Sequence, residues 1–160
     1  KAAIITGQAI EPGHRVYGLP SSGIHANGFS LVRSVLTPEV CQARAIDPES
    51  LLTPTVLYTS HVKAALEAHT ITGIAHITGG GLADNIGRLL PAHTSAIIKQ
   101  GTWPVLPIFN HIQIAGHISD SDMFQTFNMG IGLVIITPDQ LDNAYEIGYI
   151  TGGNGTVEWA

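Results

Sequence analysis

The residues from Gly18 to Arg33 read GLPSSGIHANGFSLVR, and the rest of the chain is best interpreted outward from them. The apolar run Val16–Leu19 predicts a β-strand, and a turn rich in glycine and serine follows it. From Phe29 to Leu36 apolar residues recur at helical spacing, so a helix is expected directly after the turn. A glycine-rich turn that opens a helix leaves backbone N–H groups free and is typical of an anion site. The same pattern also fits a structural turn with a serine or asparagine cap, and the local sequence does not separate the two.

Two further glycine turns occur in the chain. Thr78-Gly79-Gly80-Gly81 follows the β-branched run Ile71–Ile77, and the stretch from Asn128 to Gly132 precedes a second apolar run. A single glycine turn is more often structural than functional. Three of them in one domain, each near polar side chains, favour a polar cleft for a phosphorylated ligand. Those side chains are Ser21, Ser22, His25, Asn27, Thr78, Asn85 and Asn128.

The remaining pattern alternates strands and helices, which predicts an α/β or α+β fold with helices covering a mixed sheet. Strands are expected at Ala2–Ile5, Arg15–Leu19, Ile71–Ile77, Ser95–Lys99 and Leu133–Thr137. Helices are expected at Phe29–Leu36, Pro54–His69, Leu82–Leu90, Ile108–Ala115, Met123–Phe127 and, more weakly, Pro138–Ala144. A terminal hairpin is expected to pair Tyr145–Ile150 with Thr156–Trp159, because Asn154-Gly155 between them is a frequent hairpin turn.

The composition restricts the class of protein. A length of 160 residues fits one domain, and 44% hydrophobic against 12% charged residues predicts a surface that another domain or subunit covers. A net charge of −5 and the lack of a Lys/Arg cluster argue against a nucleic-acid partner. No run approaches the roughly 18 apolar residues of a membrane helix, and no signal peptide is visible. The single cysteine, Cys41, fits a cytoplasmic location.

Common catalytic and metal motifs are not found in the sequence. None of the eight histidines lies in an HxH, HExxH or His/Cys cluster, so no metal site is predicted. Ser21 or Ser22 with His25 could suggest a nucleophile and its base, but there is no GxSxG elbow and no identifiable acidic partner. Neither a Walker A sequence nor GxGxxG occurs. Arg88 is a candidate phosphate partner, although a solvated surface arginine is the simpler interpretation.

Six segments occur in the order found in one enzyme family. They are SSGIHANGFSLVR, PTVLY, AHITGGGLADNIGRLLP, PIFNHIQIAG, FNMGIG and AYEIG. Over about Gly13 to Ile150 the chain resembles the C-terminal domain of the aminoimidazole ribonucleotide synthetase (phosphoribosylformylglycinamidine cyclo-ligase) family. The combination of HITGGGL with FNMGIG is specific, because sibling families such as thiamine-monophosphate kinase share the fold without both motifs.

The resemblance implies a layered α/β/α domain with a mixed sheet, in which residues 1–160 form one substrate-binding domain and residues 1–12 a connector. It also implies an N-terminal domain, outside this sequence, that binds most of the ATP and Mg²⁺ and forms a homodimer. The implied reaction closes formylglycinamidine ribonucleotide to aminoimidazole ribonucleotide in purine biosynthesis. ATP would phosphorylate the formamide oxygen, and the amidine nitrogen would then displace phosphate. No nucleic acid or membrane partner is implied.

The family motifs also imply which residues face the ribonucleotide. His25 is the tentative catalytic residue, as a hydrogen-bond donor or a proton shuttle. The substrate- and phosphate-binding residues are Ser21, Ser22, Gly23, Asn27, Gly28, Thr78, Gly79, Gly80, Gly81 and Asn85, with Asn128 and Gly130 as a weaker third group.

The chain departs from the family pattern at several positions. Ala26 replaces serine, His14 replaces aspartate, Val56 and Gln125 replace arginines, and Gly87 replaces proline. The stretch Thr137–Ala144 is about one helix shorter than expected. Two alternatives therefore stand beside the cyclo-ligase: a catalytically silent binding module of the same fold, and a sibling ATP-dependent enzyme with another substrate.

Overall fold

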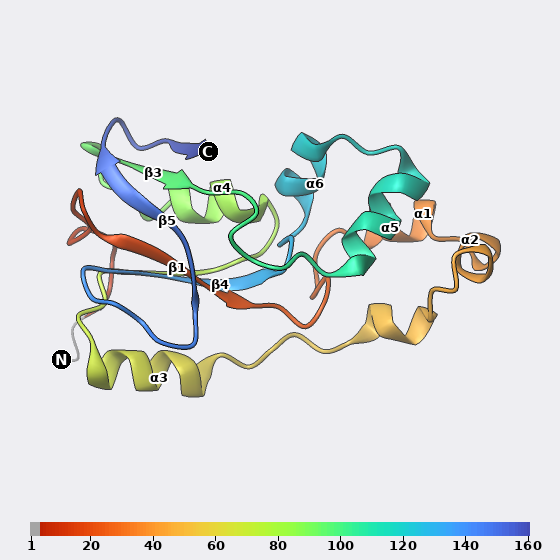
Figure 1. Ribbon diagram of the computed structural model, residues 1–160, viewed down its shortest axis with the longest axis horizontal. Coiled ribbons are helices and arrows are strands. Elements are labelled where there is room, and N and C mark those ends of the chain that lie inside the picture. Colours follow the sequence, from red (N-terminus) through yellow and green to blue (C-terminus); the bar gives the residue numbers. More distant parts are fainter. Residues whose placement is uncertain (1–3) are drawn as a thin grey trace.

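A six-stranded sheet runs through the computed structural model, which describes residues 4–160 (Figure 1). The strands stand in the order β2-β4-β1-β5-β3-β6, and every neighbouring pair is antiparallel except β3 and β6, which are parallel. The predicted mixed sheet is therefore confirmed. The strands are β1 (Arg15–Pro20), β2 (Gly73–His76), β3 (Thr94–Ile98), β4 (Ile131–Thr137), β5 (Tyr145–Gly152) and β6 (Val157–Trp159).

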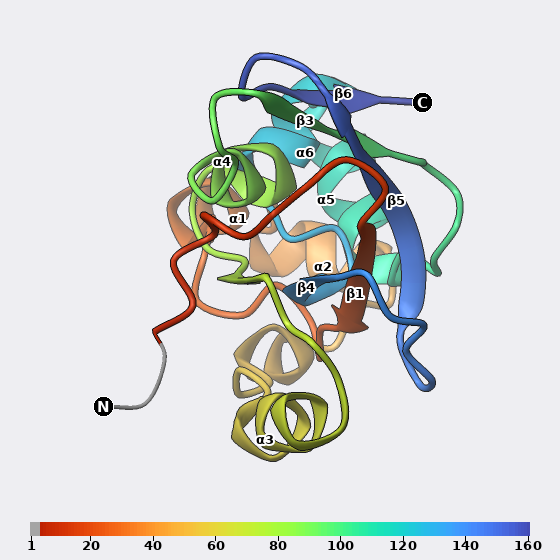
Figure 2. The ribbon, with the colours of Figure 1, turned by 90° about the vertical axis from the view of Figure 1, so that its left-hand side faces the viewer.

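Helices cover the sheet on both faces and extend beyond one end of it (Figure 1). They are α1 (Phe29–Val35), α2 (Pro38–Ala43), α3 (Thr59–Ala68), α4 (Gly81–Gly87), α5 (Pro107–Gly116) and α6 (Asp120–Thr126), together with a 3₁₀ helix, η1 (Pro48–Leu52). Figure 2 shows α3 and α4 on opposite sides of β1 and β4. This arrangement is the predicted α/β/α layering.

The core follows from the burial of β4. All seven of its residues are buried, and β-branched side chains alternate between the two faces. Ile135 packs toward Val62 of α3, whereas Val134 packs toward Leu82 of α4. A third apolar cluster, around Phe109, joins α1, α2, α5 and α6 beyond the end of the strands.

Two predicted helices are corrected by the structure. The helix expected from Pro54 begins only at Thr59, because the preceding segment is held against the end of β1: Ser22 Oγ donates to the Pro54 carbonyl at 2.8 Å and Tyr58 Oη to the Pro20 carbonyl at 2.7 Å. The weak helix at Pro138–Ala144 is wrong. Asp139 instead forms a turn, in which its N–H donates to Thr137 Oγ1, and seven residues are too few to hold a helix without packing.

The structure also differs from the expected strands at both ends of the chain. Ala2 and Ala3 of the strand expected at Ala2–Ile5 lie outside the described residues, and Ile4 and Ile5 form no strand. The terminal hairpin is wrong, because β3 lies between β5 and β6. The turn that was expected to join a hairpin binds β3 instead: the N–H of Asn154 donates to Ser95 Oγ, and that of Gly155 to the Thr94 carbonyl.

Candidate functional site

The three glycine turns meet at one end of the sheet. Both β1 and β2 are antiparallel to β4, which lies between them, so the carboxyl ends of β1 and β2 flank the start of β4. The turn after β1 (residues 21–28), the turn after β2 (78–81) and the turn before β4 (128–130) consequently form one group of loops. We refer to these three turns as the loop cluster.

Asn128 ties the first turn to the third. Its Oδ1 accepts hydrogen bonds from Ser21 Oγ at 2.9 Å and from the Gly130 N–H at 2.8 Å, and its Nδ2 donates to the Gly23 carbonyl at 2.8 Å. The Ser21 N–H in turn donates to the Gly130 carbonyl at 2.8 Å. Asn128 is only 1% exposed, so its side chain holds the turns together from inside.

Asn85 has the same role inside the second turn. Its Nδ2 lies 2.7 Å from the Gly81 carbonyl and 3.2 Å from the carbonyls of Thr78 and Gly79. Its Oδ1 accepts from Thr78 Oγ1 and from Arg88 Nη1. Asn85 and Arg88 therefore shape the turn, and the arginine that was a candidate phosphate partner is engaged with Asn85.

Unpaired backbone donors remain in the loop cluster. The N–H groups of residues 23–28 and of Gly79 and Gly80 donate to no other described residue. Several of these residues, including Gly23 and Ile24, are buried, where an unpaired N–H group is costly. Such groups are satisfied when a ligand supplies oxygen acceptors. Since α1 and α4 have only seven residues each, these loop N–H groups are the relevant donors rather than a long helix dipole.

His25 adds a side-chain donor to the loop cluster. Its backbone is left-handed, with φ of 55°, and the residue is 4% exposed. Nε2 accepts the Ser22 N–H at 3.2 Å, so the neutral ring carries its proton on Nδ1. Nδ1 is buried and has no partner among the described residues. Burial first, and then the charge of His76, lower the pKa of His25, which keeps the ring neutral.

Tyr58 and His76, which the sequence did not single out, complete a ring cluster with His25. The three ring centroids lie 6.2–6.5 Å from one another. Gly132 of β4 makes room for them, because a side chain there would overlap the Tyr58 hydroxyl and the His25 ring. Burial raises the pKa of Tyr58 to about 12, so its hydroxyl keeps the proton that it donates to Pro20. The signals available in sequence were the motifs PTVLY and HITGGG, which contain these two residues.

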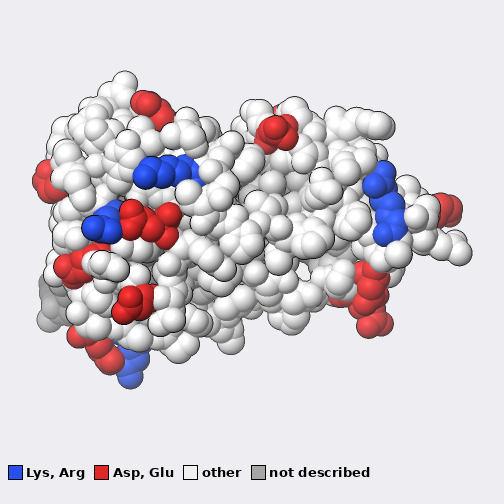
Figure 3. All heavy atoms as spheres, in the orientation of Figure 1, with Lys and Arg blue, Asp and Glu red and all other residues white. Residues whose placement is uncertain are grey.

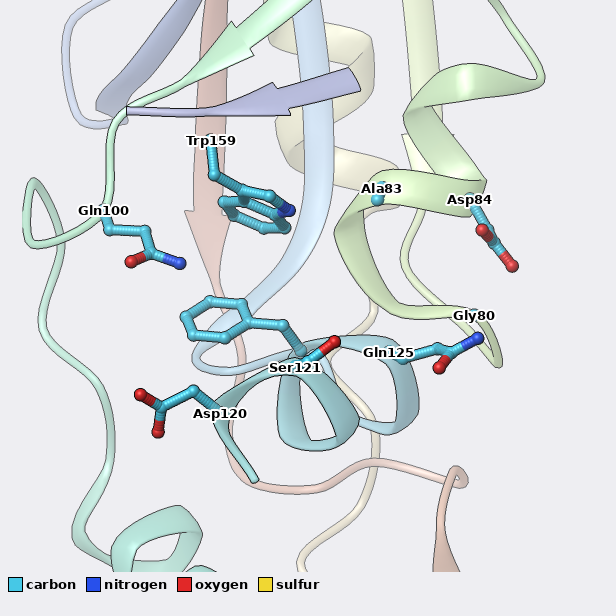
Figure 4. Close-up of a pocket in the computed structure, with 9 residues that line it drawn as sticks. Gly80, Ala83, Asp84, Gln100, Asp120, Ser121, Gln125 and Trp159 are labelled. Carbon is cyan, nitrogen blue, oxygen red and sulfur yellow. The ribbon is translucent and has the colours of Figure 1, made fainter. Parts of the chain in front are cut away.

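Two hollows border the site. A groove of about 750 Å³ runs beside the ring cluster, between His76, Leu133 and α3, and Val56 lines it. A second hollow, of about 490 Å³, lies between α4, α6 and Trp159, and Gly80 lines it (Figure 4). Asp84 and Asp120 line it without a lysine or arginine, so it is unfavourable for a phosphate group.

The departures from the family pattern lie mostly away from the ring cluster. Gln125 faces the second hollow, as Figure 4 shows, and Ala26 is exposed in the first turn. His14 Nδ1 lies 3.1 Å from Thr72 Oγ1, outside the loop cluster. Charged side chains are sparse over the middle of the face seen in Figure 3. Of the two residues that replace arginines, Val56 lines the groove beside the ring cluster, whereas Gln125 lies in the second hollow.

Helices on both faces of a mixed sheet define an α/β domain. Among solved structures, thiamine monophosphate kinase from Aquifex aeolicus shares this fold, with a TM-score of 0.62 at 16% identity over 97% of this chain and 52% of that one. The family of the AIR synthase related protein, C-terminal domain, matches residues 11–160, and the chain belongs to this family.

Several similar curated proteins carry the same name. Phosphoribosylformylglycinamidine cyclo-ligase of Bacillus subtilis (strain 168) is 42% identical over 98% of this chain and 51% of its own length. The chloroplastic/mitochondrial protein of that name from Vigna unguiculata is 42% identical over 98% of this chain and 45% of its own length. The chain thus spans about half the length of these curated relatives. The Bacillus subtilis alignment covers 177 positions, 17 more than the 160 residues present, so that relative has additional residues within the matched region.

Two kinds of feature are not found among residues 4–160. None of the helices there has the length and apolar character needed to cross a membrane. No group of three His, Cys, Asp or Glu side chains in that range converges as metal ligands.

Proposed function

We propose that this chain is the substrate-binding half of an ATP-dependent cyclo-ligase that converts formylglycinamidine ribonucleotide to aminoimidazole ribonucleotide in purine biosynthesis. Identity of 41–42% to proteins named as that cyclo-ligase, over nearly the whole chain, supports the reaction. The observation that carries the proposal is that one group of loops holds both unpaired N–H donors and the buried, unpaired Nδ1–H of His25.

The residues of the loop cluster have distinct roles in this proposal. The N–H groups of Gly79, Gly80 and the first turn bind phosphate oxygens of the ribonucleotide. His25 donates its Nδ1–H to a substrate oxygen, and it can do so at neutral pH because its ring is uncharged and its proton is fixed on that nitrogen. Asn128 and Asn85 touch no substrate in this scheme; they hold the turns at the spacing that the phosphate requires.

ATP supplies the phosphoryl group that makes the formamide oxygen a leaving group. Residues 4–160 do not provide a set of carboxylates suited to Mg²⁺. We assign Mg²⁺, most of the ATP contacts and a homodimer interface to a second domain. The length of the relatives, about twice that of this chain, supports this assignment.

The test uses the complete gene product with formylglycinamidine ribonucleotide and ATP. The expected result is formation of aminoimidazole ribonucleotide and ADP in equal amounts, which chromatography of the reaction mixture measures. Absence of product with a correctly folded protein would favour the silent binding module. Turnover of ATP only with a different phosphorylated substrate would favour a sibling enzyme.

Calorimetry with the ribonucleotide tests the loop cluster itself. Asn128→Ala removes three hydrogen bonds, two of which join the first turn to the third, and we expect it to weaken binding at least tenfold. Asn110→Ala is the matched control, because Asn110 is exposed on α5, away from the loop cluster. Equal affinities of the two variants would contradict the proposed binding role.

A further inference from the structure

The proposed function gives no role to His76, a member of the ring cluster. It is the last residue of β2 and lies two residues before Thr78 of the second turn. Its side chain is exposed, it lines the groove, and its ring makes no hydrogen bond to another described residue. The ring centroid lies 6.5 Å from that of His25 and 6.2 Å from that of Tyr58.

The other two members cannot accept a proton in the observed arrangement. The acceptor nitrogen of His25 is occupied by the Ser22 N–H, and its other nitrogen carries a proton. The Tyr58 hydroxyl donates to the Pro20 carbonyl at 2.7 Å and is itself protonated. A free ring nitrogen, the property required of a general base, is therefore left only on His76.

We propose that His76 is a catalytic base that accepts the proton released when the imidazole ring closes. This inference rests on the proposed function. In the step, the amidine nitrogen bonded to the ribose uses its lone pair to form a C–N bond to the former formamide carbon. The C–O bond to the phosphorylated oxygen breaks, phosphate leaves with that electron pair, and the N–H proton passes to His76.

The surroundings of His76 suit this role. His25 faces it from the loop cluster and Tyr58 from the start of α3, while Lys63 and Glu67 share its groove from α3 itself. Lys63 and Glu67 lie 3.9 Å apart and largely offset each other. Since His25 remains neutral, a protonated His76 meets no second positive ring. The two histidines thus have different roles: His25 donates a hydrogen bond to a substrate oxygen, and His76 accepts the proton released on ring closure.

The first test measures kcat/KM against pH for the complete gene product. His76→Gln is expected to lose about 100-fold or more at neutral pH and to lose the acidic limb of the profile. Added imidazole should restore part of the rate of this variant. His25→Gln should also lose turnover but keep the acidic limb. His93→Gln, at an exposed histidine outside the ring cluster, is the matched control and should behave as the parent.

Retention of the acidic limb, or of kcat/KM within threefold, in His76→Gln would overturn the assignment. A parent protein without turnover would instead contradict the proposed function. Nitrogen-15 NMR of the histidine rings tests the proposed protonation of His25 without depending on activity. His25 should show a protonated Nδ1 and an unprotonated Nε2, and a proton on Nε2 would overturn the division of roles.

Discussion

Gly79 and Gly81 lie two residues apart in the same turn, but only Gly81 lacks room for a side chain. Its φ is 61°, and a Cβ there would overlap the Phe124 carbonyl oxygen, whereas a Cβ on Gly79 meets nothing within 4 Å. Gly81→Ala is therefore expected to lower the free energy of unfolding by about 2–4 kcal/mol. Gly79→Ala should stay within about 1 kcal/mol of the parent. Urea unfolding of both variants measures the difference, and similar midpoints would contradict it.

The burial of His25 makes stability depend on pH. The folded state holds a neutral ring with a lowered pKa, while the unfolded chain binds a proton below about pH 6.5. The unfolded state therefore binds more protons in acid, and the free energy of unfolding falls as the pH drops below 6.5. The half-buried His14, whose pKa burial also lowers, contributes in the same direction.

His25→Gln should consequently flatten this dependence. Urea midpoints at pH 7.5 and pH 5.5 are the measurement, and the parent should lose more stability between them than the variant. An unchanged difference would show that His25 is already protonated, or solvated, in the folded state.

At the scale of single residues, the sequence predicted the turns but not the complete site. The glycine and serine pattern is local, so Ser21 and Gly79 could be singled out without knowledge of the fold. The approach of His25, Tyr58 and His76 could not, because these residues are brought together only by the placement of β4 between β1 and β2. The role of Asn128 as a tie between turns has the same cause.

At the scale of elements, α6 supports the loop cluster from behind. A Cβ on Gly28 would overlap the Phe127 ring, and the Phe124 carbonyl lies against Gly81, so the end of α6 fixes two of the three turns. Ser119 begins this helix, and its Oγ accepts the Asp122 N–H at 3.1 Å. A change at the start of α6 should therefore alter the positions of the first and second turns.

Ser119→Ala is expected to cost about 1 kcal/mol, because it removes this N-cap. Ser121→Ala in the same helix is the matched control, since Ser121 is exposed and its side chain makes no hydrogen bond to another described residue. It should change stability by no more than about 0.5 kcal/mol. Thermal unfolding of both variants is sufficient; a larger loss in Ser121→Ala would show that the cap is not what holds α6.

Elements with strong local patterns were predictable, and those set by distant contacts were not. β4 and α5 follow from an apolar run and from helical spacing, and both were found as expected. The pairing of β5 with β3 could not be deduced, because the Asn154-Gly155 turn favours a hairpin locally and only its bonds to Ser95 and Thr94 prevent one. The late start of α3 likewise depends on Tyr58 and Ser22, which lie far from each other in sequence.

For the whole molecule, the sheet predicts unequal local stability. β4 is buried along its length and hydrogen-bonded on both sides, whereas β6 is a three-residue edge strand with mostly exposed residues. Amide hydrogen exchange of β4 should be at least about 100-fold slower than that of β6. Residue-resolved NMR exchange measures this ratio. Comparable rates would mean that the sheet opens as one unit.

The overall architecture was predictable to the level of class and layering. Alternating strand and helix patterns indicated helices on a mixed sheet, and Figure 2 shows these layers around β1 and β4. The strand order was not accessible, since it depends on which apolar runs bury one another best across the whole chain.

The position of β1 in the sheet has a consequence for synthesis on the ribosome. Residues 15–20 are made early, but both neighbouring strands, β4 and β5, come from residues 131–152. The apolar side chains of β1, and the loop that follows it, therefore have no native partner until most of the chain has emerged. Because such distant pairings close slowly, folding of this domain must wait until its last third has been translated.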